Sequence, residues 1–406
     1  MKIGLITIGA ELLNGTRTDT NAAWIGLSLT SIGGKVDWHI TVNDDKDSIL
    51  NALNNVPNNI NIVLCTGGLG PTHDDITATI LYEYFGAKPE FDEEYWRILT
   101  EKFSKRGSII PDSNRNQALR PNNGDIISNP FGSARGLHFK NERYDLFSMP
   151  GVPSEMKAMM EKSILPRIEA KIENKIFVRT FRTTGIMESV LYERIEPLLE
   201  KHQNVDVAFL PKFIGVDLRI SSYNKRAFEE FLNDVFPIIE KYHFGSEDIE
   251  LEEALGKILT AKNKTVATAE SCTGGLIADR LTNVSGSSLY FKGGIVAYTN
   301  NLKIKELNVK KQTLTSHGAV SELTALEMAN GARGLFDADI GISTTGIAGP
   351  TGGTKNKPVG LVYVAISTIK YEKAFRFTFT PHRKTNKLMT SQAALNIIRL
   401  YLLNGL

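Results

Sequence analysis

The order of strands and helices in the first half of the sequence constrains the fold most. Strand composition occurs at 2–9 (KIGLITIG), 35–42 (KVDWHITV) and 60–68 (INIVLCTGG), and helix composition at 20–31 and 44–53. Strands that alternate with helices form a mostly parallel sheet with helices on both faces. The loops that follow such strands gather at one edge, where α/β sheets bind ligands. We therefore expect an α/β fold with a site at that edge.

The pattern changes twice along the chain, which at 406 residues is too long for one hydrophobic core. A small α+β segment, with helices near 188–200 and from 225 onward, carries no glycine loop and no titratable cluster. We interpret it as a spacer or dimerisation module. A helix at 249–262 then begins a third, alternating segment that ends in a helix at 385–403. The predicted domains are an N-terminal α/β domain at 1–168, a small α+β module at 169–246 and a C-terminal α/β domain at 247–406.

The charge balance gives no general attraction to nucleic acid or to a membrane. Lys and Arg number 47 against 45 Asp and Glu, and 42% of the residues are apolar. The apolar runs are far shorter than the ~20 residues that span a bilayer, and the first residues do not resemble a signal peptide. The two cysteines, Cys65 and Cys272, fall in different predicted domains. We expect a cytoplasmic protein with reduced thiols.

A glycine-rich loop follows the strand at 60–68 and precedes a predicted helix. It reads CTGGLGPTHDD over residues 65–75. Glycines let the backbone approach an anion, and a helix N-terminus directs free N–H groups at it. The aspartates at the end of the loop can hold a divalent cation against a phosphate. The candidate phosphate-binding residues are Gly67, Gly68, Gly70 and Thr72, and the candidate metal ligands are Asp74 and Asp75.

Other acidic residues also follow strands. Asp44 comes after the second strand, and Glu11 and Asp19 flank the end of the first. The simpler interpretation is helix capping, with Asp44 beginning one helix and Asp74 or Asp75 beginning another that stops at Gly86. Convergence of these carboxylates on one sheet edge favours a site.

A second polar turn occurs at 264–276, where KTVATAESCTGGL reads as a strand, a turn and glycines that open a helix. Ser271 would lie at the turn, and N–H groups of residues 272–275 are placed to stabilise an oxyanion. A serine needs a base, and we cannot place His317 or His382 against it.

Lys303 is a candidate base, just beyond a strand that ends near Tyr298. A desolvated lysine can be neutral enough to accept the serine proton, although a single lysine at a helix start is usually solvated. Cys272 is a competing nucleophile, with a buried structural thiol as its simpler interpretation. The residues alone leave these alternatives open.

Long motifs in the first 165 residues resemble one known domain. They are GAELLNGTRTDTNAAWIG, VNDDKDSI, TGGLGPTHDDIT, IPDSNRNQALRP and MPGVPSEM. They resemble the N-terminal domain of CinA proteins, which is similar to the molybdopterin-binding proteins MogA and MoaB. The resemblance implies metal-dependent ADP-ribose pyrophosphatase activity, with Asp44 and Asp75 as the acidic pair. Ala10 and the turn at 132–136 depart from the family pattern, which has an Asn and a GTAPG-like turn at these places.

The last 150 residues carry a second set of motifs. TAESCTGG, VSGSSLYFKGGIVAYTNNLK, HGAVSELTA, TTGIAGPTGGT and KPVGLVYVAI are similar to the C-terminal domain of CinA proteins and to the nicotinamide-nucleotide amidase PncC. The resemblance implies a catalytic Ser271 and Lys303, with Tyr298 in the same segment. Pro381-His382-Arg383 stands where the family has Gly-Asp-Arg, and Arg383 would bind a 5′-phosphate. The implied substrate-binding residues are Thr273, Gly274, Gly275, Thr345, Gly346, Gly349, Gly352, Gly353 and Arg383.

Together these resemblances imply an enzyme of pyridine nucleotide recycling. The C-terminal domain is expected to convert nicotinamide mononucleotide to nicotinate mononucleotide and ammonia without a cofactor. The N-terminal domain is expected to bind or cleave an ADP-ribose-like ligand with a divalent metal ion such as Mg²⁺. The alternatives are a competence- or DNA-damage-related regulatory protein, and nucleotide binding of the molybdopterin-cofactor type. We expect a homodimer with no membrane and no direct nucleic-acid partner.

Overall fold

The computed structural model describes residues 1–72, 75–105, 107–173, 175–246 and 249–404. The chain divides into two compact units, Met1–Phe177 and Val178–Leu406. The boundaries between the three predicted domains stay predictions. Among the described residues, no helix is both long enough and apolar enough to cross a bilayer.

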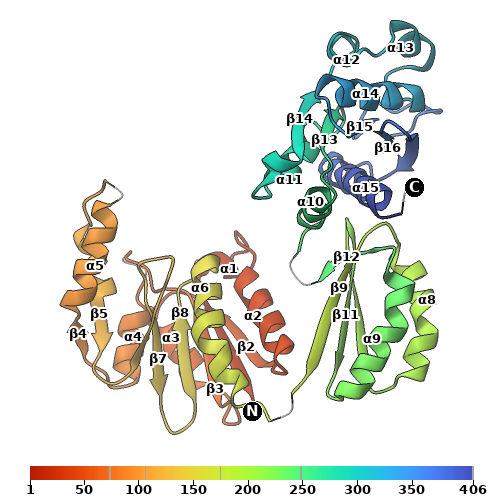
Figure 1. The fold of residues 1–406 in the computed structure, drawn as a ribbon. Helices are drawn as coiled ribbons and strands as arrows, with labels where there is room; N and C mark the ends of the chain where they lie inside the picture. Colours follow the sequence, from red (N-terminus) through yellow and green to blue (C-terminus); the bar gives the residue numbers. More distant parts are fainter. Residues whose placement is uncertain (73–74, 106, 174, 247–248, 405–406) are drawn as a thin grey trace. The chain divides into compact units, whose positions relative to one another are not determined.

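The first unit is built on a six-stranded, mostly parallel sheet with the order β2-β1-β3-β8-β7-β6 (Figure 1). The first four strands in that order are parallel, whereas β7 and β6 are antiparallel to their neighbours. This arrangement is the α/β fold that the strand and helix order predicts. The strands are β1 (Ile3–Ile8), β2 (Val36–Val42), β3 (Ile62–Thr66), β6 (Asp125–Ile127), β7 (Gly136–Lys140) and β8 (Asp145–Met149).

Alternate residues of β1 enter two different cores, as the two-residue period of a strand requires. Ile3 and Leu5 pack with α2 and α6, while Ile6 and Ile8 pack with α3 and α4. A small two-stranded sheet and α5 form a separate extension of this unit. The other elements are α1 (Ala10–Leu13), α2 (Thr20–Ser31), α3 (Lys46–Asn54), α4 (Thr77–Tyr84), β4 (Pro89–Phe91), α5 (Glu93–Ser104), the 3₁₀ helix Asp112–Ala118, β5 (Leu119–Pro121), α6 (Pro153–Met159), the π-helical turn Met160–Ile164 and α7 (Leu165–Glu169).

The expected caps of two helices were wrong. Asp45, not Asp44, caps α3, because its carboxylate accepts the N–H of Ser48. Asp75 does not cap α4, which begins at Thr77 without a side-chain cap. Both corrections leave the carboxylates of Asp44 and Asp75 free of a capping role. Residue 86 does follow α4 as a left-handed glycine, as expected.

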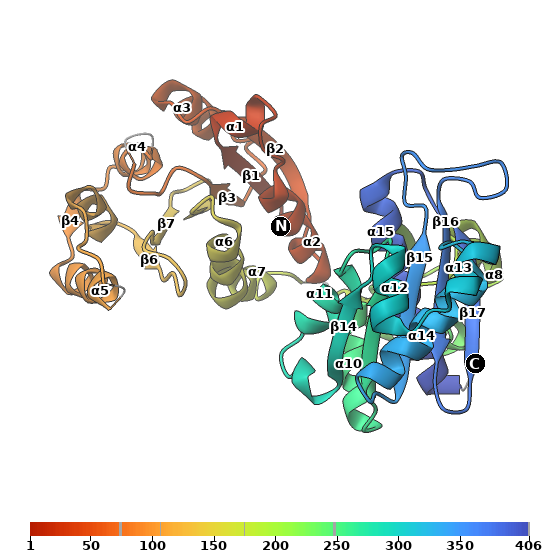
Figure 2. The ribbon, with the colours of Figure 1, turned by 90° about the horizontal axis from the view of Figure 1, so that it is seen from above.

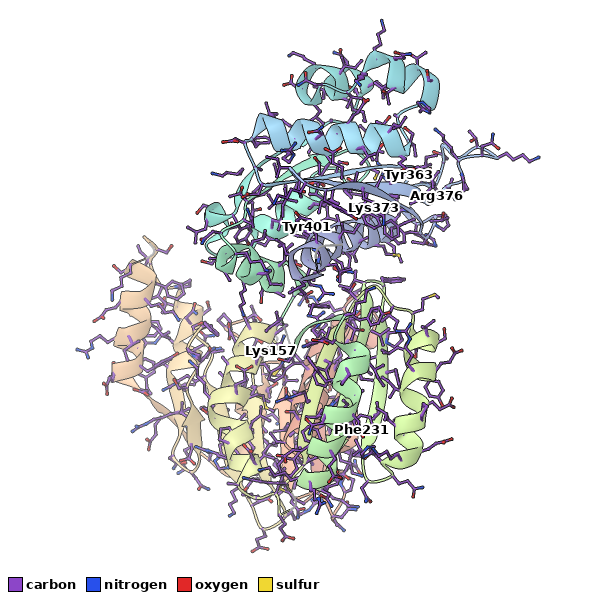
Figure 3. The ribbon with its side chains drawn as sticks, turned by 45° about the vertical axis from the view of Figure 1, so that its right-hand side comes forward. Lys157, Phe231, Tyr363, Lys373, Arg376 and Tyr401 are labelled. Atoms are coloured by element: carbon purple, nitrogen blue, oxygen red, sulfur yellow. The ribbon has the colours of Figure 1, made fainter. Side chains whose placement is uncertain are left out.

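The second unit begins with a four-stranded antiparallel sheet of order β10-β11-β9-β12. Helices α8 and α9 pack on it, and the amphipathic α9 buries Phe231, which is labelled in Figure 3. Two of these strands, β10 and β12, were not predicted from the sequence. The elements are β9 (Phe177–Thr183), α8 (Glu188–Lys201), β10 (Asp206–Lys212), β11 (Gly215–Ser222), α9 (Lys225–Ile239) and β12 (His243–Ser246).

The rest of this unit is a five-stranded mixed sheet of order β14-β13-β15-β16-β17. Helices α10, α11 and α15 pack in one core with β13, β15 and β16, while α12 and α14 pack in another core with β13 (Figure 2). The elements are α10 (Leu251–Ala261), β13 (Val266–Glu270), α11 (Leu276–Thr282), the 3₁₀ helix Ser287–Leu289, β14 (Phe291–Val296), α12 (Asn300–Leu307), α13 (Lys311–His317), α14 (Glu322–Leu335), β15 (Ile340–Gly346), β16 (Leu361–Ser367), β17 (Glu372–Thr378) and α15 (Arg383–Asn404).

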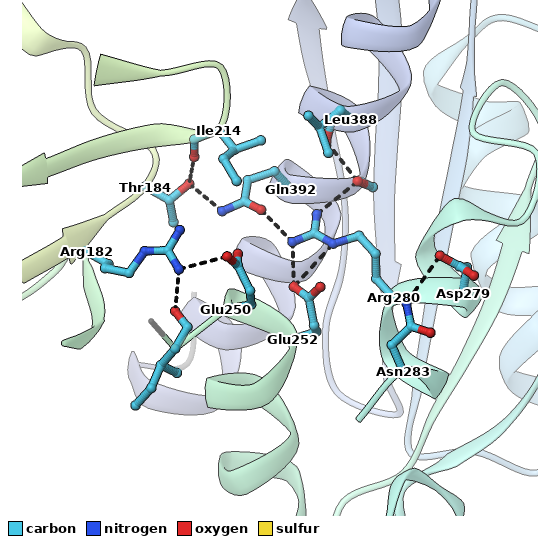
Figure 4. Close-up of polar contacts among 12 residues, drawn as sticks. Arg182, Thr184, Ile214, Glu250, Glu252, Asp279, Arg280, Asn283, Leu388 and Gln392 are labelled. Atoms are coloured by element: carbon cyan, nitrogen blue, oxygen red, sulfur yellow. Dashed lines mark hydrogen bonds and ion pairs between the residues drawn. The ribbon is translucent and has the colours of Figure 1, made fainter. Parts of the chain in front are cut away.

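A buried polar network joins the two sheets of this unit (Figure 4). The guanidinium of Arg280, on α11, contacts the carboxylate of Glu252 at 2.6 Å and the amide oxygen of Gln392 at 2.7 Å. The amide nitrogen of Gln392 donates in turn to Thr184 of the module at 3.2 Å. Because α11 starts just after the Ser271 turn, the network fixes the helix that carries this turn.

Candidate active site

Ser271 follows β13 directly and lies within hydrogen-bond distance of Lys303. The N–H of Ser271 donates to the carbonyl of Thr344 at 2.9 Å, which fixes the turn to β15. Lys303 lies on α12, and its Nζ is 3.0 Å from Ser271 Oγ and 2.6 Å from the carbonyl oxygen of Ala297. The fold thus brings together two predicted side chains that are 32 positions apart.

Burial controls the charge of Lys303. Only 1% of the residue is exposed, and within the described ranges no carboxylate forms an ion pair with it. Burial lowers the pKa of its ammonium group, because the charged form loses its hydration. An amine with a lowered pKa can accept the proton of a serine hydroxyl.

Burial has the opposite effect on the reactivity of Cys272. Its side chain is buried, and burial raises the pKa of the thiol to about 12. The nucleophilic thiolate is therefore scarce at neutral pH. Among the described residues, no hydrogen bond joins a histidine to Ser271 or Cys272. The geometry favours Ser271, which has a base at hydrogen-bond distance, over Cys272.

Glu270 caps the beginning of α11 through its carboxylate. This role was not predicted from the sequence. Its carboxylate is 1% exposed and accepts the N–H groups of Gly275, Ile277 and Ala278 at 2.9, 3.1 and 2.8 Å. The expected oxyanion role of the Gly275 N–H is therefore wrong, because this group is already used. A buried acid at the end of a strand, a few residues before a helix, is the signal that could have revealed this cap.

The turn itself requires glycines. Gly274 and Gly275 both have positive φ angles, 61° and 94°, which other residues adopt at a cost. The side chain of Thr273 is fully buried and bonded to the Thr344 hydroxyl at 2.7 Å, so it does not face a ligand. Among the described residues, the N–H groups of Cys272, Thr273 and Gly274 have no oxygen acceptor, and they remain the candidate oxyanion donors.

The predicted substrate loop is held by its own backbone packing. A Cβ on Gly349 would lie 2.3 Å from the Pro381 carbonyl, and one on Gly353 would lie 2.7 Å from the Val359 nitrogen. Gly346 is similarly close to the Leu361 carbonyl, at 2.7 Å, and Gly352 has a φ of 90°. The glycines thus serve close packing and turns. Thr345 is buried, and its hydroxyl donates to the Ala319 carbonyl at 2.7 Å, so its side chain also points away from a ligand.

Arg383 connects the loop to the Tyr298 segment. Its guanidinium donates to the Tyr298 hydroxyl at 2.6 Å and to the Gly349 carbonyl at 3.3 Å. Lys387, which the sequence analysis missed, adds a second cation. Its Nζ would be 3.4 Å from a Cβ on Gly274, beside the Ser271 turn. Lys387 follows Arg383 by four residues, so both cations lie on the same face of the helix. This spacing is the feature of the sequence that could have identified Lys387.

The first unit contains a cavity of about 620 Å³ at the carboxyl ends of β1, β2 and β3. Several glycines line it because other residues would clash. A Cβ on Gly67 would be 2.2 Å from the Ile8 carbonyl, and one on Gly68 would be 2.1 Å from Thr77 Oγ1. The lining includes the predicted Asp44, Gly67, Gly68, Gly70, Thr72 and Asp75, together with Glu11, Arg17, Gln117 and Glu155.

The carboxylates of this cavity suit a hard cation. Asp44, Asp75, Glu11 and Glu155 all line it, and Asp75 Oδ2 accepts the Thr72 N–H at 2.9 Å. Asp74 lies outside the described residues. No group of three or more candidate ligands is preassembled in the described ranges. The donors fit Mg²⁺ as this ion usually binds, by one or two carboxylates together with ligand phosphates.

Of the two departures from the family pattern, only the turn at 132–136 lines the cavity. Ser133 and Ala134 line the cavity, whereas Ala10 does not. The guanidinium of Arg135 forms an ion pair with Asp92 at 2.6 Å and lies over the Tyr95 ring. Arg135 therefore fixes the turn to α5 instead of serving as a ligand cation.

Comparisons with known proteins match all three segments of the chain. Residues 248–402 match the family described as the CinA C-terminal domain, and residues 4–170 match a probable molybdopterin binding domain. Residues 178–245 match the KH domain of the damage-inducible protein CinA.

Relatives match over nearly the whole length. A CinA-like protein of Salinibacter ruber is 40% identical over 98% of this chain and 99% of its own length. Another, from Chloroherpeton thalassium, is 41% identical over 97% and 98%. The crystal structure of the competence/damage inducible protein CihA from Agrobacterium tumefaciens is 40% identical, with a TM-score of 0.36, over 38% of this chain and 99% of that one. The chain belongs to the CinA family.

Proposed function

We propose that the C-terminal part of the second unit hydrolyses the carboxamide of nicotinamide mononucleotide to nicotinate mononucleotide and ammonia. One observation carries the proposal: Nζ of the buried Lys303 is 3.0 Å from Ser271 Oγ. This pair can perform amide hydrolysis, which needs a nucleophile and a base. The choice of substrate rests on the resemblance to nicotinamide-nucleotide amidases.

In the first half of the reaction, Ser271 Oγ forms a bond to the carboxamide carbon. Its proton moves to neutral Lys303, and the carboxamide oxygen becomes an oxyanion that the N–H groups of Cys272, Thr273 and Gly274 stabilise. When the tetrahedral intermediate collapses, the C–N bond breaks. Lys303 then returns the proton to the departing nitrogen, which leaves as ammonia.

In the second half, water attacks the nicotinoyl ester on Ser271. Lys303 accepts a proton from the water and returns it to Ser271 Oγ as the ester bond breaks. Nicotinate mononucleotide leaves, and the free serine is regenerated. Arg383 and Lys387 bind the 5′-phosphate in this proposal, since both are cations near the loop or the turn. Tyr298 orients Arg383 through the hydroxyl contact.

The test is ammonia release from nicotinamide mononucleotide by the full-length protein. Ser271→Ala should abolish release while leaving nucleotide binding within about threefold. Thr282→Ala is a matched control, because among the described residues the hydroxyl of Thr282, on α11, bonds only to its own helix. Full activity of Ser271→Ala would refute the proposed nucleophile.

The cavity of the first unit supports a second activity, the binding or cleavage of an ADP-ribose-like pyrophosphate. Here the supporting observation is that glycine-loop residues and several carboxylates line one cavity. Asp44 and Asp75 would hold a divalent cation, which would neutralise phosphate charge. Calorimetry with ADP-ribose should show binding that needs the cation and weakens in Asp75→Ala. Equal binding by this variant in chelator would refute the site.

A regulatory role is the alternative. A solved relative is named as competence/damage inducible, and one family is described as molybdopterin binding. The balanced charge does not favour direct nucleic-acid contact. If the full-length chain neither releases ammonia nor cleaves ADP-ribose, the regulatory alternative replaces both enzymatic proposals. We also propose a cytoplasmic location and a homodimer, as the sequence analysis expects.

A further inference from the structure

Arg280, on α11, joins this helix to two others through buried bonds. The residue is only 6% exposed. Its Nε and Nη2 contact the carboxylate of Glu252, on α10, at 3.2 and 2.6 Å. On α15, its Nη1 donates to Ser391 Oγ at 2.9 Å and its Nη2 to Gln392 Oε1 at 2.7 Å (Figure 4). Because a guanidinium is a rigid, planar fork, these bonds fix both the distance and the direction between the helices.

The helices α11 and α15 carry opposite ends of the proposed amidase site. Helix α11 starts after Gly275, at the end of the Ser271 turn, and Arg280 lies in its second turn. On α15, Lys387 precedes Ser391 by four residues, which is a rise of about 6 Å along the helix. Arg280 therefore connects the reacting turn to the phosphate-binding end of α15 through about one helical turn on each side.

Apolar packing between the two helices fixes their relative position less strictly. Ile277 and Leu281 of α11 share a core with Leu395 of α15. Apolar contacts are non-directional, so they oppose separation of the helices more than sliding of one along the other. A buried ion pair is also weak evidence for stability. The bonds from Arg280 to α15 are therefore best explained by the geometry that they impose.

The bond between Arg280 and Gln392 continues into the module with the four-stranded sheet. Arginine only donates, so Gln392 Oε1 must face it, and Gln392 Nε2 then donates to Thr184 Oγ1 at 3.2 Å. The Thr184 hydroxyl donates in turn to the carbonyl of Ile214, which only accepts, at 2.8 Å. Every bond in this series runs in one direction. The module thus holds the amide whose oxygen holds Arg280.

We propose that Arg280 is a positioning residue for the amidase reaction and sets the spacing between Ser271 and the phosphate-binding cations of α15, Arg383 and Lys387. When the 5′-phosphate is bound, this spacing decides whether the carboxamide carbon reaches about 3–3.5 Å from Ser271 Oγ. Thr184 supports the spacing from the module, through Gln392. This inference rests on the proposed hydrolysis of nicotinamide mononucleotide.

The test measures ammonia release from nicotinamide mononucleotide by the full-length protein and its inhibition by ribose 5-phosphate, which carries the phosphate but no carboxamide. Arg280→Lys keeps a cation for Glu252 but loses the fork that reaches α15. Its kcat should fall roughly 10- to 100-fold, because a misplacement of about 1 Å can cost about 10²-fold. The inhibition constant of ribose 5-phosphate should stay within about threefold, because the cations of α15 remain.

Turnover is expressed per folded molecule, with the folded fraction measured by circular dichroism. A merely structural arginine would lower the melting temperature without changing this quantity. Gln392→Leu leaves Arg280 its bonds to Glu252 and Ser391, and it decides the case if Arg280→Lys does not fold.

Thr184→Val removes only the bond from the module and should lower kcat by about threefold or more. Arg333→Lys is the matched control. Arg333, on α14, donates to Ser367 and Asn330, neither of which lies on α11 or α15.

The possible results separate this inference from the proposed function. A wild type that releases no ammonia refutes both. If the wild type is active and both Arg280→Lys and Gln392→Leu keep kcat within about threefold, the positioning role is refuted and the proposed function stands. Ribose 5-phosphate that fails to inhibit the wild type, or inhibits Arg280→Lys far more weakly, would also overturn the spacing role. An equal loss of turnover in Arg333→Lys would show a general packing effect, and unchanged turnover in Thr184→Val would refute the contribution of the module.

Discussion

Replacing Lys303 by Met separates its chemical role from its packing role. Met has nearly the same length and fills most of the space of the buried side chain, so it avoids the cavity that Ala would leave. The change removes the amine that contacts Ser271 Oγ at 3.0 Å and the Ala297 carbonyl at 2.6 Å. Ammonia release should fall by about 10²–10⁴, the range of general-base catalysis. This loss corresponds to about 3–5 kcal/mol of transition-state stabilisation.

The effect on folding should be smaller. The Ala297 carbonyl loses its bond to Lys303, at a cost of about 1–3 kcal/mol. Removing a poorly hydrated amine offsets part of this cost, because burial disfavours its charged form. We therefore expect the free energy of unfolding at pH 7 to change by less than about 2 kcal/mol.

The pH dependence gives the most specific result. Burial lowers the pKa of Lys303 in the folded protein, whereas the unfolded chain keeps a value near 10.4. Between these two values the unfolded state binds more protons, so the wild type gains stability relative to Lys303→Met as the pH rises through this window. Wild-type turnover should rise with pH through the lowered pKa, as the neutral base becomes populated.

The assays are ammonia release from pH 6 to 10 and thermal unfolding over the same range, with Lys305→Met as the control. Lys305 lies on the same helix and is exposed. Lys303→Met with turnover within threefold of the wild type would refute general-base catalysis. A stability difference that does not change with pH would refute the lowered pKa.

Three other predictions concern single groups. Cys272→Ala should retain most activity whereas Ser271→Ala is inactive, as measured by ammonia release; the opposite result would establish a thiol mechanism. Glu270→Gln should lower the free energy of unfolding by roughly 2 kcal/mol or more and also slow turnover, because one of three N–H groups at the start of α11 loses its carboxylate partner; melting temperature and turnover equal to those of the wild type would contradict this. Burial lowers the pKa of His243 below its ordinary value. As the pH falls below about 6.5, the unfolded chain therefore binds a proton at His243 more readily than the folded protein does, and the folded protein loses stability. His243→Gln should accordingly show a smaller loss of melting temperature between pH 7 and pH 5.5, and an identical loss would contradict the assignment.

Local patterns in the sequence predicted the strands and helices around the two candidate turns, which are β1, α2, β2, α3 and β3 in the first unit and β13 in the second. The strand at 2–9 and the helix at 20–31 agree with β1 and α2, because strand and helix composition are properties of neighbouring residues. The glycine turn before α11 was also recognisable. The strands β10 and β12 were missed; β10 lies at an edge of its sheet and β12 is only four residues long, so neither carries a strong apolar pattern.

The order of residues defines which side chains stand at each turn, and this was enough to locate the two candidate sites. The hydrogen bonds, burial and charge of those side chains depend on folding. The distance between Ser271 and Lys303 depends on how α12 packs against the end of β13, and the lowered pKa of Lys303 depends on burial. In the same way, folding assigns the Gly275 N–H to the carboxylate of Glu270. Hydration and hydrogen bonding are set by neighbours that are distant in the chain, and for this reason no local pattern could supply them.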